Sequence, residues 1–114
     1  MDLTQYVVIN SSIRSWPVGP IVAQGAHASV AVLHEHAEHE NVKAYLSDLD
    51  RMTKVVMEVK STEALLKLST ELVSADIPHR VWVEQPENVP TALATVPFPK
   101  QTLRPLLKKT RLMS

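Results

Sequence analysis

The chain has 114 residues, of which 45% are hydrophobic and 21% charged, and this is typical of a single domain spanning residues 1–114. Twelve Lys and Arg residues balance twelve Asp and Glu residues, so any anion-binding surface must be local. The absence of cysteine excludes a disulfide framework and a cysteine nucleophile. We expect a cytoplasmic protein, because no apolar run reaches the roughly 18 residues of a membrane span and no secretory signal is recognisable.

The first half of the chain predicts two strands separated by two helices. Tyr6–Ile9 is a short β-branched and aromatic run, which indicates a buried strand. Pro20 suits the first turn of a helix that we expect to continue to about His36. A shorter helix is expected at Glu40–Leu49, and the β-branched run Thr53–Val59 predicts the second strand.

The helix from Pro20 carries two stripes of different chemistry. Apolar residues recur at steps of four, four and three and are expected to face the sheet: Val22, Ala26, Val30 and Leu33. The second stripe is rotated away from the first and contains Gln24, His27, Ala31 and His34.

The second half predicts a helix, two strands and a last helix. Ser61 or Thr62 is expected to cap this helix, which Asp76-Ile77-Pro78 ends. Strands are expected at His79–Val83 and Thr91–Val96, joined by a short proline-containing loop. The last helix is expected from Thr102, with an inner apolar face and a basic outer face that contains Arg104, Lys108 and Arg111. This order of elements predicts an α/β layered domain with a mixed sheet.

Gln24 and His27 are candidate site residues. They are polar, lie one turn apart and follow the loop that brings the helix N-terminus to the end of the first strand. Ligands gather at such strand ends in α/β proteins, and helix N-termini favour anions. The alternative is that His27 only forms a hydrogen bond with a neighbouring loop.

Two further features could bind RNA. The segment from Lys100 to the C-terminus contains no acidic residue, so its cations could contact phosphates, although simple solvation also explains them. Arg14 lies beside Trp16, and the pair could offer a guanidinium and an indole to a phosphate or base. Packing of Trp16 under the loop explains this pair equally well.

Several other chemistries lack support in the sequence. His34 points about 200° away from His36 around a helix, so these two cannot converge with His39 on a metal. Only two glycines are present, which excludes a glycine-rich phosphate loop and argues against a nucleotide cofactor. There is no Gly-x-Ser-x-Gly element for a serine nucleophile.

The segment Gly19–Ala28 resembles the first helix of type 2 peptidyl-tRNA hydrolases, whose signature is Gly-Lys-x-Ala-Ala-Gln-x-x-His-Ala. The resemblance extends through Leu65–Leu72, Ile77–His79 and Pro99–Lys100 along nearly the whole chain. It implies a three-layer α/β/α sandwich around a four-stranded mixed sheet, often as a homodimer. It also implies cleavage of the ester between a peptide and the terminal ribose of tRNA, with no metal or organic cofactor.

The chain departs from the family pattern near the candidate site. Pro20 replaces the signature lysine, which would polarise the carbonyl or stabilise the oxyanion, and Glu84 replaces an aspartate. The Gly-x-Thr-Gln segment is replaced by Pro86-Glu87-Asn88. Three residues remain candidates for the chemistry, Glu84 as the acid/base residue and Gln24 and His27 as groups that position substrate or water. The loop next to the site contains Gln85, Glu87 and Asn88.

Two functions of different classes therefore stay open. The first is a peptidyl-tRNA hydrolase with Gln24, His27 and Glu84 at the ester, and with RNA contacts at Arg14, Trp16, Lys100, Arg104, Lys108 and Arg111. The second is a non-catalytic adaptor that keeps the fold and a tRNA-binding or protein-binding groove. Hydrolysis of another small ester or amide is a weaker third reading.

Overall fold

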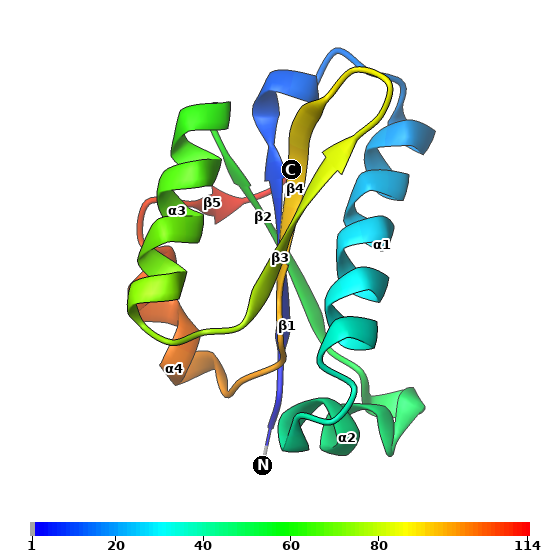
Figure 1. The fold of residues 1–114 in the computed structure, drawn as a ribbon, viewed down its shortest axis with the longest axis vertical. Helices are drawn as coiled ribbons and strands as arrows, with labels where there is room; N and C mark the ends of the chain where they lie inside the picture. The colour runs from blue at the N-terminus through cyan, green and yellow to red at the C-terminus, as the bar shows by residue number, and fades with distance from the viewer. Residues whose placement is uncertain (1) are drawn as a thin grey trace.

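The centre of the molecule is a mixed sheet of five strands in the order β3-β4-β1-β2-β5 (Figure 1). This computed structural model describes residues 2–114. The strands are β1 Gln5–Asn10, β2 Lys54–Val59, β3 His79–Glu84, β4 Val89–Thr95 and β5 Arg111–Leu112. β1 is parallel to β2 and antiparallel to β4. The mixed sheet is as predicted, but it has five strands rather than four because the unpredicted β5 pairs with β2.

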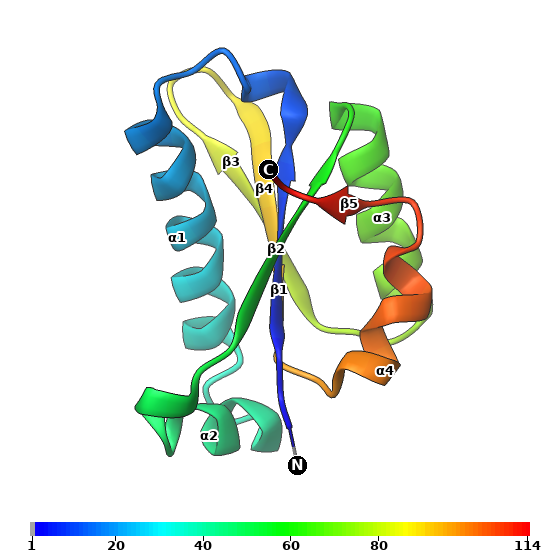
Figure 2. The same ribbon diagram turned by 180° about the vertical axis from the view of Figure 1, so that it is seen from behind.

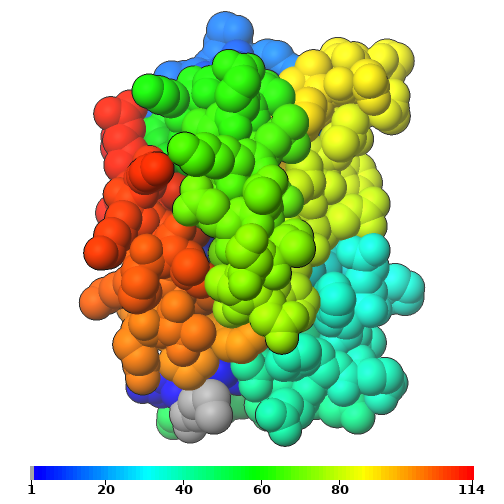
Figure 3. Space-filling view, turned by 60° about the vertical axis from the view of Figure 1, so that its left-hand side comes forward, coloured from blue at the N-terminus to red at the C-terminus, as the bar shows by residue number. Residues whose placement is uncertain are grey.

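Helices cover the two faces of the sheet and confirm the three-layer prediction (Figures 1 and 2). They are α1 Val18–Glu35, α2 Glu40–Leu46, α3 Thr62–Ser74 and α4 Lys100–Leu103. α1 and α2 lie on one face, and α3 and α4 on the other. In Figure 3, α3 lies beside the segment that runs from α4 to β5. Short 3-10 helices occupy Ser11–Ile13, Leu49–Arg51 and Arg104–Leu107.

The central strand β1 contributes to two separate cores because its side chains alternate between the faces. Tyr6 and Val8 pack with the leucines of α3 and with Leu103 and Leu107. Val7 and Ile9 pack on the other face with α1 and with small residues of β4. Every residue of β1 is buried, as expected for a strand with neighbours on both sides and helices on both faces.

The face that α1 turns toward the sheet differs from the predicted stripe. Val22 and Val30 are 65% and 67% exposed, whereas Gln24, Ala28, Ser29 and Val32 are buried. The physical reason is close approach: a Cβ atom added at Gly25 would lie 3.3 Å from Val7 Cγ1. Small side chains on this face bring the helix near the strands, and the valines then point outward.

The last helix is shorter than predicted. α4 begins at Lys100, and the chain continues as a 3-10 turn with Pro105 near its start. Pro105 lacks an N–H, so it cannot continue a regular helical hydrogen-bond pattern. Arg111 lies on β5 rather than on a helix, and the predicted basic helical face of Arg104, Lys108 and Arg111 does not form.

A buried carboxylate links the first loop, β2 and the C-terminal segment. Glu58 on β2 contacts the Arg14 guanidinium, accepts a hydrogen bond from Ser11 Oγ at 2.6 Å and lies 3.3 Å from Arg111 Nε. Arg14 also donates to the backbone oxygen of Ser114 at 3.2 Å. The hydrogen bonds from Ser11 and Arg14, together with the charges of both arginines, lower the pKa of Glu58 against the effect of burial. Glu58 therefore stays ionised and holds the C-terminal segment against β2.

Because the pKa of Glu58 is lowered by folding, its ionised form stabilises the native state above the ordinary carboxyl pKa and loses this effect as the pH falls through the lowered value. We predict that Arg14→Ala reduces the free energy of unfolding by about 1–3 kcal/mol at pH 7. The loss should shrink in acid, as measured by urea unfolding at several pH values. Arg51→Ala, which breaks an exposed pair with Asp48, is the control and should cost less than about 1 kcal/mol. An equal loss at every pH would contradict the role of Glu58.

Candidate active site

The candidate site lies where α1 passes the ends of β3 and β4. Gln24 is in the second turn of α1, Glu84 is the last residue of β3, and Thr91 is on β4. β3 and β4 form an antiparallel hairpin, and the loop between them lies near the first turns of α1 (Figure 1). Residues from three parts of the sequence are therefore brought to one end of the sheet.

The amide of Gln24 is fixed at both ends. Its side chain is 2% exposed, and Nε2 donates to Glu84 Oε2 at 3.3 Å and to the Pro20 carbonyl oxygen at 3.2 Å. The Thr91 hydroxyl donates to Gln24 Oε1 at 2.8 Å. These partners define which end of the amide carries the nitrogen, and they connect α1 with both strands of the hairpin.

The carboxylate of Glu84 receives a second donor from its own strand. Trp82 Nε1 donates to Glu84 Oε1 at 3.0 Å, and the Trp82 ring stacks on His27 with centroids 4.8 Å apart. The hydrogen bond from Trp82, followed by that from Gln24, lowers the pKa of Glu84, while desolvation acts in the opposite direction. The charge of His27 also favours the ionised carboxylate. Glu84 is thus a partly exposed, ionised and oriented carboxylate.

This arrangement can orient a water molecule and accept its proton. An ionised carboxylate with free lone pairs is a hydrogen-bond acceptor for water, and the nearby imidazole of His27 can position a polar substrate. The position of the family lysine is taken by Pro20, whose carbonyl accepts from Gln24. The structure thus brings Gln24, His27 and Glu84 together, as the sequence predicts.

The loop residues predicted near the site follow Glu84 directly. Gln85, Glu87 and Asn88 are exposed, and Gln85 Nε2 donates to Asn88 Oδ1 at 3.2 Å. Asn88 has a φ of 57°, a left-handed conformation that asparagine tolerates better than most residues. The departure from the family sequence at this point therefore forms a tight hairpin turn.

The residues predicted to bind RNA do not gather at this site. Arg14 and Arg111 converge on Glu58, and Trp16 is partly buried against the core beneath α1. Trp16 thus packs under the loop, which is one of the two alternatives for this residue. Lys100 lies at the far end of the molecule, at the start of α4. Arg104 and Lys108 are exposed residues of the segment that follows α4.

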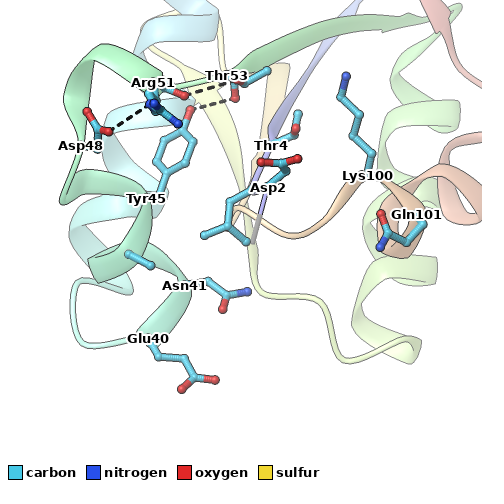
Figure 4. A pocket seen from close by; sticks show the side chains of 12 residues that line it. Asp2, Thr4, Glu40, Asn41, Tyr45, Asp48, Arg51, Thr53, Lys100 and Gln101 are labelled. Carbon is cyan, nitrogen blue, oxygen red and sulfur yellow. Dashed lines mark hydrogen bonds and ion pairs between the residues drawn. The ribbon is translucent and has the colours of Figure 1, made fainter.

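A polar cavity of about 800 Å³ occupies this far end (Figure 4). Lys100, Tyr45 and Arg51 are among its lining residues. Arg51 pairs with Asp48 at 3.4 Å, and Tyr45 donates to the Thr53 carbonyl oxygen at 2.9 Å. None of the three candidate catalytic residues lines this cavity, so it is separate from the candidate site.

A metal site and a membrane-spanning helix each have requirements that the described residues do not meet. Within residues 2–114, no three histidine or acidic side chains are grouped so that they could hold a metal ion. His39 instead caps α2, where its Nδ1 accepts from the Asn41 N–H at 3.0 Å. Over the same residues, no helix is both long and apolar enough to cross a bilayer.

Sequence reasoning missed two residues of the candidate site, Trp82 and Thr91. Trp82 could have been found, because residues two apart on a strand share a face, which places its indole beside Glu84. Thr91 could not, because its position depends on the hairpin register and on the irregularity between Trp82 and Val83.

Comparisons with known proteins agree with this fold. The family model for peptidyl-tRNA hydrolase PTH2 matches residues 3–113. The fold and the match over nearly all of the chain define its class: the chain belongs to the PTH2 peptidyl-tRNA hydrolase family.

Two named proteins and one solved structure are similar to this chain over most of its length. Human and mouse proteins named "Putative peptidyl-tRNA hydrolase PTRHD1" are each 43% identical, with 96% of this chain and 81% of the relative covered. A solved structure of a protein of unknown function, Atu0240 from Agrobacterium tumefaciens, superposes with a TM-score of 0.64 over 100% of this chain and 99% of that one. At 13% identity, the latter shows a shared fold alone.

Proposed function

We propose that the protein is a peptidyl-tRNA hydrolase that cleaves the ester between the peptide and the terminal ribose of tRNA. The observation that carries the proposal is the 3.3 Å contact between Gln24 Nε2 and Glu84 Oε2, with His27 one turn further along α1. All three residues stand at positions that match the family pattern. The family membership and the names of the relatives support the same reaction.

In this reaction Glu84 acts on water. Its carboxylate accepts a proton as the water oxygen attacks the ester carbonyl carbon. The bond from that carbon to the ribose oxygen then breaks, and the ribose oxygen leaves with the proton returned by Glu84. The products are a peptide with a free carboxyl group and a tRNA with a free hydroxyl. Gln24 orients Glu84, and His27 positions the substrate or the water.

The second candidate function is a non-catalytic adaptor that binds tRNA or a protein. Pro20 favours it, because the position of the family lysine offers a carbonyl oxygen rather than a cation, and that oxygen is occupied by Gln24. Loss of one preorganised donor typically lowers turnover about 10²- to 10³-fold. The rate of peptide release therefore distinguishes the hydrolase from the adaptor.

The decisive experiment is release of peptide from N-acyl-aminoacyl-tRNA by the purified protein. We predict slow turnover by the wild type and at least about a 100-fold loss in Glu84→Gln, because the amide cannot accept the proton from water. Glu71→Gln on α3, across the sheet, is the matched control and should retain full turnover.

The same peptide-release experiment tests whether Pro20, at the position of the family lysine, has abolished catalysis. A wild type that binds the substrate without releasing peptide, together with a Pro20→Lys variant that gains release, would establish the adaptor. Equal turnover in Glu84→Gln and the wild type would exclude Glu84 as the acid/base residue.

We also propose that tRNA phosphates contact the exposed cations Lys100, Arg104 and Lys108. Arg14 and Arg111 are paired with Glu58, and Trp16 packs under the loop, so these three residues are left out of the proposed surface. Because the exposed cations are spread over the surface, each should act separately. Each alanine substitution at a phosphate contact should lower the slope of log affinity against log salt by about 0.7–0.9. Filter binding over a salt series measures this slope. An unchanged slope in all of these variants would exclude the proposed surface.

We propose a cytoplasmic homodimer that forms through α1. Val18, Val22 and Val30 are exposed at helical spacing, and the chain carries no Asp, Glu, Lys or Arg between Arg14 and Glu35. Charge depletion on an exposed apolar face is typical of interface cores. We predict a dimer in sedimentation velocity and a monomer for Val22→Glu. Leu66→Glu, at an exposed leucine of α3, is the control and should remain dimeric. A monomeric wild type would refute this proposal.

A further inference from the structure

Trp82 contacts two of the three candidate catalytic residues at the same time. Its indole N–H donates to Glu84, and its ring stacks on His27. We propose that Trp82 is a positioning residue, which holds the Glu84 carboxylate and the His27 imidazole in the orientation needed to act on water at the ester. This inference rests on the proposed hydrolytic function and assigns a role to a residue outside the signature that the chain shares with its family.

The Glu84 carboxylate is oriented by a donor on each of its two oxygens. Trp82 donates to Oε1 at 3.0 Å, and Gln24 donates to Oε2 at 3.3 Å. One donor on each oxygen fixes the plane of the carboxylate and leaves further lone pairs for a water molecule. Without the indole N–H, Glu84 Oε1 would lose its side-chain donor, and the carboxylate could rotate more freely about its side-chain bonds.

The Trp82 indole is itself held in place by its packing. Trp82 is partly buried, packs against the core beneath α1 and pairs with the small, buried Ala92 of β4. The Arg80 guanidinium lies 5.9 Å from the Trp82 ring centroid and is anchored to Glu35 of α1 at 2.8 Å. A ring fixed by α1 and β4 can transmit that fixed position to Glu84.

The groups around the Glu84 carboxylate come from α1, from β3 and from the hairpin loop. From α1, the side chains of Gln24 and His27 face this carboxylate, and Trp82 faces it from β3. Arg80 is paired with Glu35 beside the indole, and Glu87 lies in the exposed hairpin loop. The two direct side-chain donors to Glu84 are thus uncharged. In this chain the hydrogen bonds from an indole N–H and an amide are the largest causes that lower the pKa of Glu84, and the charge of His27 adds to them.

The test compares wild type with Trp82→Phe, which keeps an aromatic ring against His27 but removes the N–H. We expect kcat for peptide release to fall about tenfold with KM changed less than about twofold, because orientation rather than binding is lost. The acidic limb of the pH profile should move to higher pH, since loss of the donor raises the pKa of Glu84. A structural role alone would not move this limb.

Tyr45→Phe is the matched control. It also removes one aromatic donor, the hydroxyl that donates to the Thr53 carbonyl at 2.9 Å, but at the other end of the molecule. Thermal unfolding of both variants shows whether each is folded. We expect Tyr45→Phe to retain the wild-type kcat and pH profile, whatever its loss of stability.

A second readout separates this inference from the proposed function. Carbon-13 NMR titration of the Glu84 carboxyl group reports its pKa without any substrate. An unchanged Glu84 pKa in Trp82→Phe, or an unchanged kcat and pH profile, would overturn the role of Trp82. A wild type that releases no peptide would overturn the proposed hydrolase and with it a catalytic purpose for Trp82, even if the pKa of Glu84 differs between the two proteins.

Discussion

Burial of the Gln24 amide is the constraint on which the candidate site depends. A buried amide without partners would cost several kcal/mol, so the helix that carries it must lie where acceptors and donors are available. Thr91 on β4 and Glu84 on β3 meet this requirement from two adjacent strands. The same hydrogen bonds that stabilise α1 on the sheet therefore also place a carboxylate at the surface beside His27.

This constraint also explains why α1 presents its valines to solvent. Gly25, Ala28 and Ser29 lie on the buried face with Gln24, and their small size permits the close approach that the Gln24 contacts require. Ser29 satisfies its hydroxyl by donating to Gln5 Oε1 at 2.7 Å. Val22 and Val30 are left exposed, where a purely hydrophobic analysis would not place them. The geometry of the site thus determines the apolar character of an exposed surface.

Elements that follow local rules were predictable from the sequence. The β-branched run of β2 and the Ser61 cap of α3 formed as expected, because strand propensity and helix capping depend on neighbouring residues. The inner leucines Leu103 and Leu107 are buried as expected, although the helix around them is short.

Features that depend on distant partners were not predictable. β5 is only two residues long, and two distant contacts hold it: Arg111 pairs with Glu58, more than fifty positions earlier, and Arg14 donates to the backbone oxygen of Ser114. The face of α1 that is buried is the one that carries Gln24, because Thr91 and Glu84 form hydrogen bonds with its amide. These partners lie on β4 and β3, so the sequence of α1 alone does not reveal which face is buried. Family motifs identified Gln24, His27 and Glu84, but the distances between them and the part of Trp82 emerged only from the fold.

The replacement of the family lysine by Pro20 changes the electrostatics of the site rather than its architecture. A lysine at this position would add a cation beside Glu84, whereas the Pro20 carbonyl instead accepts a hydrogen bond from the amide that orients Glu84. The two side-chain donors to the carboxylate, the Trp82 indole and the Gln24 amide, are uncharged and lower the pKa of Glu84 without adding a cation at the position of the family lysine. In the proposed reaction, stabilisation of the developing oxyanion would then depend on His27 or on the substrate itself. If Glu84 is the acid/base residue, as proposed, a site that lacks the lysine at the oxyanion should bind its substrate well and turn it over slowly.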